Sequence, residues 1–287
     1  METIKADFGN WHIQCIPEDG ARISVLKYAG HNLLTTYPSV LRAPQKFIGE
    51  YETRPVYGYD DCFPSVDPCF YPEEQFECRD HGELCWQKWH VENMSNKIIC
   101  TVECPSPKAT FTRILEFEDN RLKWKFKVVS QSASELVFLH VMHALMPLSE
   151  IQYIELPEFL VILDEDTLIE LNFRHPDEVA DYLINCVEGT FKMLLLKNPR
   201  KGIVKVDFKN GLSIKIEYGI DLFPTLGIWW NNFGYPLEDG LGRVECAFEP
   251  IPGSCSNLNK SFKDGIYLKV KPGETLNWQI GWELQMK

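Results

Sequence analysis

Hydrophobic and polar residues alternate along most of this chain. Between Leu122 and Val128 every second residue is large and hydrophobic, and the residues between them are lysines. A period of two is typical of a β-strand with one buried and one solvated face. The segment 111–117 has the same period and joins the first through Glu118-Asp119-Asn120, a tight-turn composition. The two segments therefore predict an antiparallel hairpin.

A second hairpin is marked by its turn. The segment 203–208 runs into Asn210-Gly211, and alternation resumes over 212–218. Asn-Gly favours the two-residue turns that join antiparallel strands. The best helix candidate starts at Pro176, with acidic residues in its first turn. Further strands are predicted at 11–16, 21–28, 97–102, 135–145, 191–197, 244–248, 265–270 and 276–284.

This pattern predicts an all-β protein of mostly antiparallel strands with very little helix, built as a sandwich or barrel. No linker-like stretch interrupts the 287 residues, so we expect a single domain over 1–287. The segment 41–77 is rich in Pro, Tyr, Cys and Asp and is poorly periodic. We expect it to form a long loop over one face, and loops of that length commonly carry function.

The amino-acid composition limits the classes of protein to which this chain can belong. Hydrophobic residues make up 45% and charged residues 24% of the chain, which is typical of a soluble globular protein. The amino terminus lacks the basic start and apolar core of a secretory signal, so we expect a cytoplasmic protein with no membrane segment. The ten cysteines form no CxxC pair and no zinc spacing, so we expect reduced thiols and no metal.

The net charge of −12 bears on partners. Nucleic-acid binding depends on basic patches, and the sequence has no cluster of Lys and Arg interleaved with aromatic residues. A neutral polyol is easier to reconcile with this surface than a nucleic acid. We therefore expect a small-molecule partner, and the sequence leaves a homodimer open.

Two histidines, His140 and His143, lie three residues apart in a predicted strand. An odd separation sends the two side chains to opposite faces, so they cannot readily bind one metal together. At most one lines a cleft, and His143 lies nearer the strand end marked by Pro147. The alternative for either is a hydrogen-bonded histidine in a core.

Aromatic residues accompany a second histidine motif. Asp80-His81-Gly82-Glu83 is a turn-capable tetrapeptide that leads into Trp86. Trp229 and Asn231 lie in another segment bounded by glycines. Sugar rings stack their C–H faces on indole, while Asn amides match ring hydroxyls. The alternative is an ordinary core role for the tryptophans and a plain turn around His81.

Glu249 is the least ordinary carboxylate. It follows a hydrophobic run and directly precedes Pro250. Because proline cannot donate to a β-ladder, we expect Pro250 and Pro252 to end the strand and to place Glu249 at a site there. Desolvation between Phe248 and Pro250 would raise its pKa. The alternative is a solvated loop glutamate.

Several motifs together resemble those of the aldose 1-epimerase (mutarotase) family, in the right order and over nearly the whole chain. They are Pro17 to Ile23, Tyr28 to Leu34, Asp80-His81-Gly82-Glu83-Leu84, His143-Ala144-Leu145, Gly227-Ile228-Trp229, Phe248-Glu249-Pro250, and Pro272-Gly273-Glu274-Thr275 with Trp278. The resemblance implies a β-supersandwich that holds a sugar on a concave face and interconverts its α and β anomers with no cofactor. Glu83-Leu84-Cys85-Trp86 departs from the usual pattern and is closer to a less characterised branch.

The resemblance also implies roles for individual residues. His143 would be the general acid on the ring oxygen, Glu249 the general base on the anomeric hydroxyl, and His81 a binding residue. Further substrate contacts are expected from Asp80, Trp86, Trp229, Asn231 and Arg79. The sugar-contacting arginine is one of Arg42, Arg54 and Arg79, and Gly58-Tyr59-Asp60-Asp61 either supplies a carboxylate or forms a turn.

The reaction explains why an imidazole and a carboxylate would be needed. Opening a cyclic hemiacetal requires removal of a proton from O1 and delivery of another to O5. We expect His143 and Glu249 to meet on opposite sides of one bound pyranose.

Three alternatives remain. One is a non-catalytic carbohydrate-binding or regulatory protein. A second is a glycosidase that pairs Glu249 with Asp80 or Glu83 at about 5 to 10 Å. The third is a hexose-phosphate mutarotase with at least two Arg or Lys side chains at the cleft rim.

Overall fold

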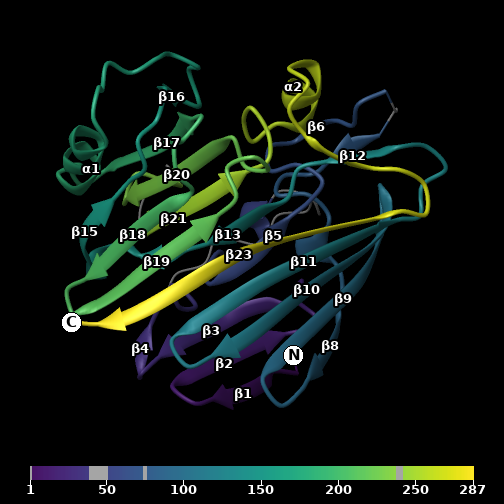
Figure 1. The fold of residues 1–287 in the computed structure, drawn as a ribbon, viewed down its shortest axis with the longest axis horizontal. Helices are drawn as coiled ribbons and strands as arrows, with labels where there is room; N and C mark the ends of the chain where they lie inside the picture. Colours follow the sequence, from purple (N-terminus) through teal and green to yellow (C-terminus); the bar gives the residue numbers. More distant parts are fainter. Residues whose placement is uncertain (1, 39–50, 74–75, 237–241) are drawn as a thin grey trace.

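The computed structural model describes residues 2–38, 51–73, 76–236 and 242–287, and most of these form antiparallel β-sheet (Figure 1). The largest sheet has eight strands and lies toward the front of Figure 1, with β23 crossing its middle. In spatial order its strands are β15 (Ile151–Glu155), β18 (Ile203–Phe208), β19 (Leu212–Tyr218), β23 (Thr275–Met286), β11 (Arg121–Ser130), β10 (Lys108–Glu118), β9 (Lys97–Pro105) and β8 (His90–Asn93).

Two smaller sheets hold the functional region. The six-stranded sheet comprises β1 (Ile4–Phe8), β2 (Trp11–Ile16), β3 (Arg22–Tyr28), β5 (Tyr59–Cys62) and β13 (Val141–Ala144), with β4 (His31–Asn32) paired to β3. The five-stranded sheet comprises β14 (Met146–Pro147), β21 (Val244–Ile251), β20 (Thr225–Asn232), β17 (Thr190–Lys197) and β16 (Val161–Asp164).

The remaining elements are short. Two-stranded ribbons pair β12 (Leu136–Phe138) with β22 (Leu268–Val270) and β6 (Cys69–Phe70) with β7 (Glu77–Cys78). The helices of the described chain are α1 (Pro176–Ile184), α2 (Leu258–Lys263) and the 3₁₀ turns η1 (Tyr51–Thr53), η2 (Leu84–Trp86) and η3 (Leu148–Glu150). None of the helices in these residues is long and apolar enough to cross a membrane.

The period-two prediction is confirmed in both hairpins. In β11 the alternate residues from Leu122 to Val128 are buried and the lysines between them face outward. β10 and β11 pair around the predicted turn, with Phe117 opposite Leu122. The second hairpin, β18 and β19, has the predicted bounds. The fold class is therefore the expected one, because hydrophobic alternation directly records which strand face is buried.

Three element predictions are wrong in detail. The expected strand 135–145 is broken into β12 and β13, with His140 buried between them. The expected loop 41–77 contains β5, although 41–50 and 74–75 lie outside the described residues. The expected strand 265–270 shrinks to β22, and the short helix α2, which the sequence did not predict, precedes it.

Pro250 does not end its strand, since β21 continues to Ile251. The reason lies in the neighbouring strand. β14 pairs only with Glu245 and Cys246 of β21, so Pro250 lies beyond that ladder and costs no hydrogen bond on that edge.

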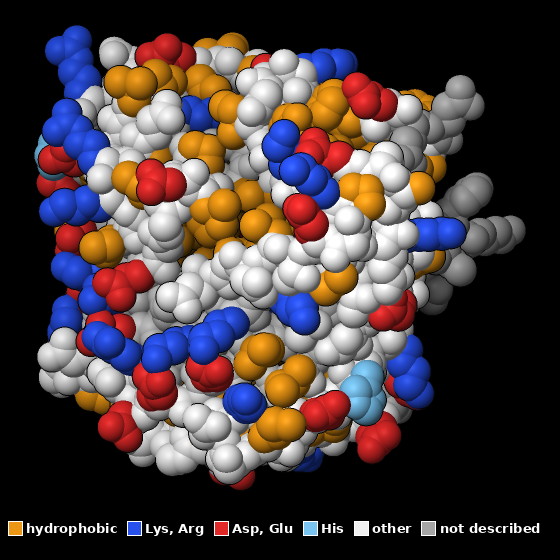
Figure 2. Space-filling model, turned by 45° about the vertical axis from the view of Figure 1, so that its right-hand side comes forward, with side chains coloured by type: hydrophobic (Ala, Val, Ile, Leu, Met, Phe, Trp, Pro, Cys, Tyr) orange, Lys and Arg blue, Asp and Glu red, His pale blue; other side chains and the backbone are white. Residues whose placement is uncertain are grey.

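The sheets share a core. Tyr59 of β5 packs on Trp124 of β11 with ring centroids 4.6 Å apart, which places β5 against the eight-stranded sheet. All ten cysteines are free thiols, and most of them are buried. On the face drawn in Figure 2, acidic and basic side chains are interspersed and hydrophobic side chains line a hollow near the middle.

Candidate active site

A cleft of about 410 Å³ lies where the five-stranded sheet meets β13 and the turns around Tyr51 and His81. It collects residues from segments far apart in the sequence. Its lining residues are Tyr51, Glu52, Val56, Val66, Asp67, Asp80, His81, His143, Glu165, Asp166, Phe191, Met193, Trp229, Tyr235, Arg243, Glu245, Glu249, Ser256 and Lys260.

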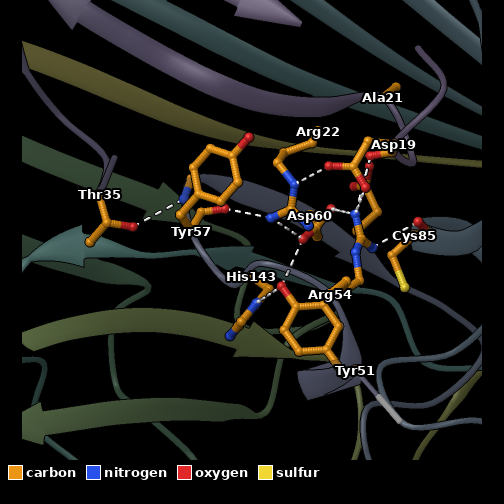
Figure 3. Close-up of polar contacts among 12 residues, drawn as sticks. Asp19, Ala21, Arg22, Thr35, Tyr51, Arg54, Tyr57, Asp60, Cys85 and His143 are labelled. Atoms are coloured by element: carbon orange, nitrogen blue, oxygen red, sulfur yellow. Dashed lines mark hydrogen bonds and ion pairs between the residues drawn. The ribbon is translucent and has the colours of Figure 1, made fainter. Parts of the chain in front are cut away.

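His143 reaches this cleft from β13, where it pairs opposite Asp60 of β5. Its Nδ1 lies 3.2 Å from the hydroxyl oxygen of Tyr51, and the same hydroxyl lies 2.7 Å from Oδ2 of Asp60 (Figure 3). Burial, reinforced by the positive charges of His81, Arg243, Arg22 and Arg54, holds the pKa of His143 well below its ordinary value. The ring is therefore neutral at neutral pH.

Behind His143, Asp60 anchors a buried cluster of charges. Its Oδ2 lies 2.8 Å from Nη1 of Arg22, and its Oδ1 lies 3.5 Å from Nη2 of Arg54. Arg22 also pairs with Asp19 at 2.6 Å and donates to the carbonyl of Tyr57. Figure 3 shows these groups converging on Asp60 above the Tyr51 hydroxyl, with His143 to the left of the same hydroxyl. The cluster satisfies buried charges that would otherwise be costly.

His81 enters from a strained turn. Its φ is +58° and that of Gly82 is +72°. A Cβ on Gly82 would lie 2.0 Å from the carbonyl oxygen of Phe63, so only glycine fits. Nδ1 of His81 lies 2.8 Å from Oδ1 of Asp80. Burial alone would lower the pKa of His81, but the Asp80 carboxylate outweighs it and raises the pKa.

Tyr51 links the two histidines. Its ring stacks on His81 with centroids 3.8 Å apart, and its backbone N–H donates to Oδ2 of Asp80 at 3.2 Å. The His81 and His143 rings lie 4.8 Å apart, edge to face. The two imidazoles thus form one side of the cleft.

Glu249 faces them from β21. Its side chain is only 3% exposed, and its Oε1 lies 4.0 Å from Nε2 of His143. Burial, with the nearby carboxylates of Glu165 and Asp67 and against the opposing charge of His81, raises its pKa to about 8. Among the described residues, burial and charged neighbours account for this shift, and no hydrogen bond to the carboxyl group contributes to it. Such a carboxyl group can exchange a proton with a ligand near neutral pH.

The other walls are aromatic and acidic. The rings of Phe191, Trp229 and Tyr235 lie 5.5 to 5.7 Å from one another. Arg243 is held by Glu52 at 2.8 and 3.0 Å and by Glu245 at 2.9 Å. Its guanidinium nitrogens are thus already occupied by carboxylates.

Glu165 also lines the cleft and accepts hydrogen bonds from the backbone N–H and the hydroxyl of Ser256, at 2.7 and 2.9 Å. Burial raises the pKa of Glu165 to about 7. Asp67, Asp166 and Lys260 are further lining residues. The cleft lining is therefore rich in acidic side chains and includes a cluster of aromatic rings.

The structure brings together His81, Asp80, Trp229, His143 and Glu249, all of which the sequence singled out. His140 takes the core alternative, with Nε2 3.0 Å from Oδ1 of Asp61 and Nδ1 accepting from Trp278. The expectation that only one of the two strand histidines lines a cleft is confirmed.

Three expected substrate contacts lie elsewhere. Trp86 is not among the cleft-lining residues; its partly buried ring packs against a hydrophobic cluster that includes Cys85 and lies under the guanidinium of Arg54. Asn231 is fully buried; its amide donates to the carbonyl of Tyr235 and accepts from the backbone N–H groups of Gly234 and Tyr235. Arg79 is 40% exposed and pairs with Glu83. Arg54 is likewise committed to buried partners, and Arg42 lies outside the described residues.

Sequence reasoning missed Tyr51, Arg243, Glu245 and Glu165. Tyr51 lies within the segment 41–77, which the sequence predicts only as a long loop, and Arg243 directly precedes the strand that carries Glu249. Glu245 did carry a signal, since it lies an even four residues from Glu249 and so shares its strand face. No group of three or more His, Cys, Asp or Glu side chains that could hold a metal occurs in the described part of the chain.

Known structures give the fold a context. No protein-family model matches the sequence, and no curated protein matches it either. A protein from Escherichia coli K12 named as a "putative aldose 1-epimerase" superposes with a TM-score of 0.74 at 13% identity, covering 100% of this chain and 99% of that chain.

Two further structures agree. A galactose mutarotase related enzyme from Lactobacillus acidophilus has a TM-score of 0.70 at 15% identity, covering 99% of this chain and 97% of that one. A galactose mutarotase-like protein from Clostridium acetobutylicum has a TM-score of 0.70 at 16% identity, covering 99% and 95%. The chain therefore has the galactose mutarotase-like fold over its whole length, as the sequence motifs implied. At these identities the likeness establishes the fold alone.

Proposed function

We propose that this protein is an aldose 1-epimerase that interconverts the α and β anomers of a sugar. The observation that supports this most directly is the 4.0 Å separation of His143 Nε2 and Glu249 Oε1 inside the cleft. In the pyranose form of an aldose, O1 and O5 are both bonded to C1. Two proton-exchanging groups this close can reach both oxygens at once, which is what concerted ring opening needs.

The short separation changes the expected pose. A pyranose ring cannot fit between groups 4.0 Å apart, so the sugar lies over both of them rather than between them. Its apolar face then meets the aromatic wall formed by Phe191, Trp229 and Tyr235. His81, paired with Asp80, supplies positive charge near the ring oxygens.

The charge of the cleft favours an unphosphorylated sugar. Arg243 and Lys260 are the cleft's Lys and Arg residues in the described chain, and Arg243 is already bound by two glutamates. Acidic side chains outnumber these cations even without Glu165 and Glu249, whose raised pKa values favour protonation, because Glu52, Asp67, Asp80, Asp166 and Glu245 also line the cleft. A phosphate dianion would have to displace the carboxylates from Arg243.

The glycosidase alternative loses one of its partners, since Glu83 pairs with Arg79 and is not among the cleft residues. Asp80 does line the cleft, but its oxygens are engaged by His81 and by the backbone of Tyr51. The side chains of Glu83 and Asp80 both have partners already, which disfavours a second catalytic role for either.

Anomer exchange measured by NMR with a panel of free aldoses tests the proposal. The wild-type protein should accelerate exchange for at least one of them, and His143→Asn or Glu249→Gln should each lower kcat by about a hundred- to ten-thousand-fold. His90→Asn, an exposed histidine, and Glu188→Gln, an exposed glutamate, are matched controls that should leave kcat unchanged.

Variants at His143 and Glu249 as active as the wild type would refute the proposal. Sugar binding by calorimetry without any acceleration of exchange would instead favour the non-catalytic carbohydrate-binding alternative.

A further inference from the structure

We propose that Tyr51 is a positioning residue that fixes the proton of His143 on Nδ1, so that His143 accepts the anomeric proton and Glu249 donates one to the ring oxygen. These roles are the reverse of those implied by the sequence resemblance. The inference rests on the proposed anomer exchange, but its structural part can be measured without any sugar.

The first step concerns Asp60. Its carboxylate pairs with the guanidinium groups of Arg22 at 2.8 Å and Arg54 at 3.5 Å. An ionised carboxylate can only accept hydrogen bonds. The Tyr51 hydroxyl, 2.7 Å from Oδ2, must therefore donate its proton to Asp60. Burial raises the pKa of Tyr51, so its hydroxyl stays protonated and can donate this hydrogen bond.

The second step concerns the histidine. With its proton directed at Asp60, the Tyr51 oxygen offers only lone pairs to Nδ1 of His143, 3.2 Å away (Figure 3). Two facing lone pairs would repel, so Nδ1 carries the hydrogen and donates it to Tyr51. A neutral imidazole with a proton on Nδ1 has none on Nε2. The lone pair of Nε2 thus points into the cleft.

The third step concerns Glu249, whose Oε1 faces that lone pair at 4.0 Å. Burial raises the pKa of this carboxyl group to about 8, so it is mostly protonated at neutral pH. The titratable neighbours that act on Glu249 are His81, Glu165 and Asp67, and Nδ1 of His81 is bound to Asp80. The resting cleft therefore presents an acceptor on His143 and a donor on Glu249.

The chemistry balances with these roles. In ring opening, the O1–H proton moves to Nε2 of His143 and the O1–H electron pair forms the C1=O1 double bond. The C1–O5 bond breaks, its electron pair stays on O5, and O5 takes the Glu249 proton. After the aldehyde group rotates, O5 attacks the other face of C1 and returns its proton to Glu249. O1 then recovers a proton from His143, and both side chains regain their starting state.

Tyr51 also supports the intermediate stage. When Nε2 takes up the proton, the imidazolium donates from Nδ1 through Tyr51 toward the Asp60 carboxylate, which stabilises the new charge. The same residue stacks on His81 and holds Asp80 through its backbone N–H. One tyrosine thereby positions both cleft histidines.

The direct test is ¹⁵N NMR of the histidine ring nitrogens in the wild-type protein, with the His143 signals identified by their loss in His143→Asn. At neutral pH we expect a protonated Nδ1 and an unprotonated Nε2. A proton on Nε2, or a doubly protonated ring, would overturn the inference without any activity measurement.

The variant test uses Tyr51→Phe, which keeps the ring stacked on His81 but removes the hydroxyl. We expect a mixture of His143 tautomers and a kcat about tenfold lower at unchanged KM, since one hydrogen bond is lost. Tyr57→Phe is the matched control, because Tyr57 belongs to the same cluster and touches Arg22 without contacting His143 in the described residues. It should change neither quantity.

An unchanged His143 tautomer in Tyr51→Phe would remove the positioning role. The two proposals can also fail separately. A wild-type protein with the expected tautomer but no anomer exchange refutes the function and leaves the assignment of the proton in place.

Discussion

The rings of His81 and His143 are in contact, yet their pKa values shift in opposite directions. Burial disfavours the charged form of both, but Asp80 binds Nδ1 of His81 at 2.8 Å while His143 faces a tyrosine hydroxyl and several cations. The pKa of His81 therefore rises and that of His143 falls. A partner of opposite charge, rather than the depth of burial, separates the two residues. Adjacent groups with opposite shifts are the usual arrangement for acid-base chemistry.

The pKa of Glu249 predicts how stability depends on pH. Folding raises this pKa from 4.5 to about 8, in a setting that includes His143, His81, Glu165 and Asp67. Between these values the folded protein holds a proton that the unfolded chain releases. The unfolding free energy contributed by this group therefore falls as pH rises from about 4.5 through about 8.

Glu249→Gln removes that titration. In urea unfolding, we expect the stability of the variant relative to wild type to increase between pH 5 and pH 9, by on the order of a few kcal/mol. Glu188→Gln, at an exposed position, should show no such trend. An equal difference between Glu249→Gln and wild type at both pH values would contradict the raised pKa.

At the scale of single elements, the sequence predicts regular strands well and special ones poorly. β2, β18 and β19 have the expected bounds because their alternation reports a half-buried surface. The sequence predicts a loop where β5 lies, because the segment 41–77 is poorly periodic and rich in Pro, Tyr, Cys and Asp, including Asp60 and Asp61. Both are buried, and each is neutralised by arginines from distant segments, which no local pattern records.

The turn that carries His81 gives a prediction about Gly82. Gly82→Ala should lower both the unfolding free energy and the anomer-exchange rate, because a Cβ would lie 2.0 Å from the Phe63 carbonyl oxygen at a φ of +72°. Gly9→Ala is the matched control, with a φ of +62° and no atom within 4 Å of its Cβ. It should cost only the left-handed strain of about 1 to 2 kcal/mol.

Chemical denaturation of the two variants separates crowding from backbone strain. Gly82→Ala should be clearly the less stable of the pair. Equal losses would mean that the Phe63 carbonyl yields easily and that the turn is not tightly held.

At the scale of the whole molecule, a buried ion pair ties two sheets together. Arg113 of β10 pairs with Asp61 of β5, and Asp61 also bonds Nε2 of His140 at 3.0 Å. Asp61→Asn leaves the Arg113 guanidinium buried without its counter-charge, so we expect a loss of about 3 to 5 kcal/mol. Urea unfolding measures it.

The exposed pair of Arg200 and Glu158, 2.9 Å apart, provides the comparison. Glu158→Gln should leave the urea midpoint within error, because solvent screens that pair. A loss below about 1 kcal/mol in Asp61→Asn would mean that the inter-sheet tie contributes little.

A residue of the site could be predicted only where its type and its sequence motif indicated a function. His143, His81 and Glu249 stood out by type and motif, whereas their mutual distances come from the pairing of β13 with β5 and from the approach of β21. Tyr51 and Arg243 gain their roles solely from that long-range assembly. Trp86 and Asn231 were misplaced because hydrophobicity and hydrogen-bonding capacity serve a core as well as a ligand.

The two adjacent aspartates of β5 have a last consequence. Successive residues of a strand point to opposite sides, so Asp60 lies behind Tyr51 and His143 while Asp61 holds the sheets together. A deletion or insertion of one codon just before Tyr59 would turn each carboxylate toward the other's partners. A change in the length of this segment would therefore alter the cleft and break the buried ion pair between the sheets at the same time. We expect homologues to differ here by substitutions rather than by insertions or deletions.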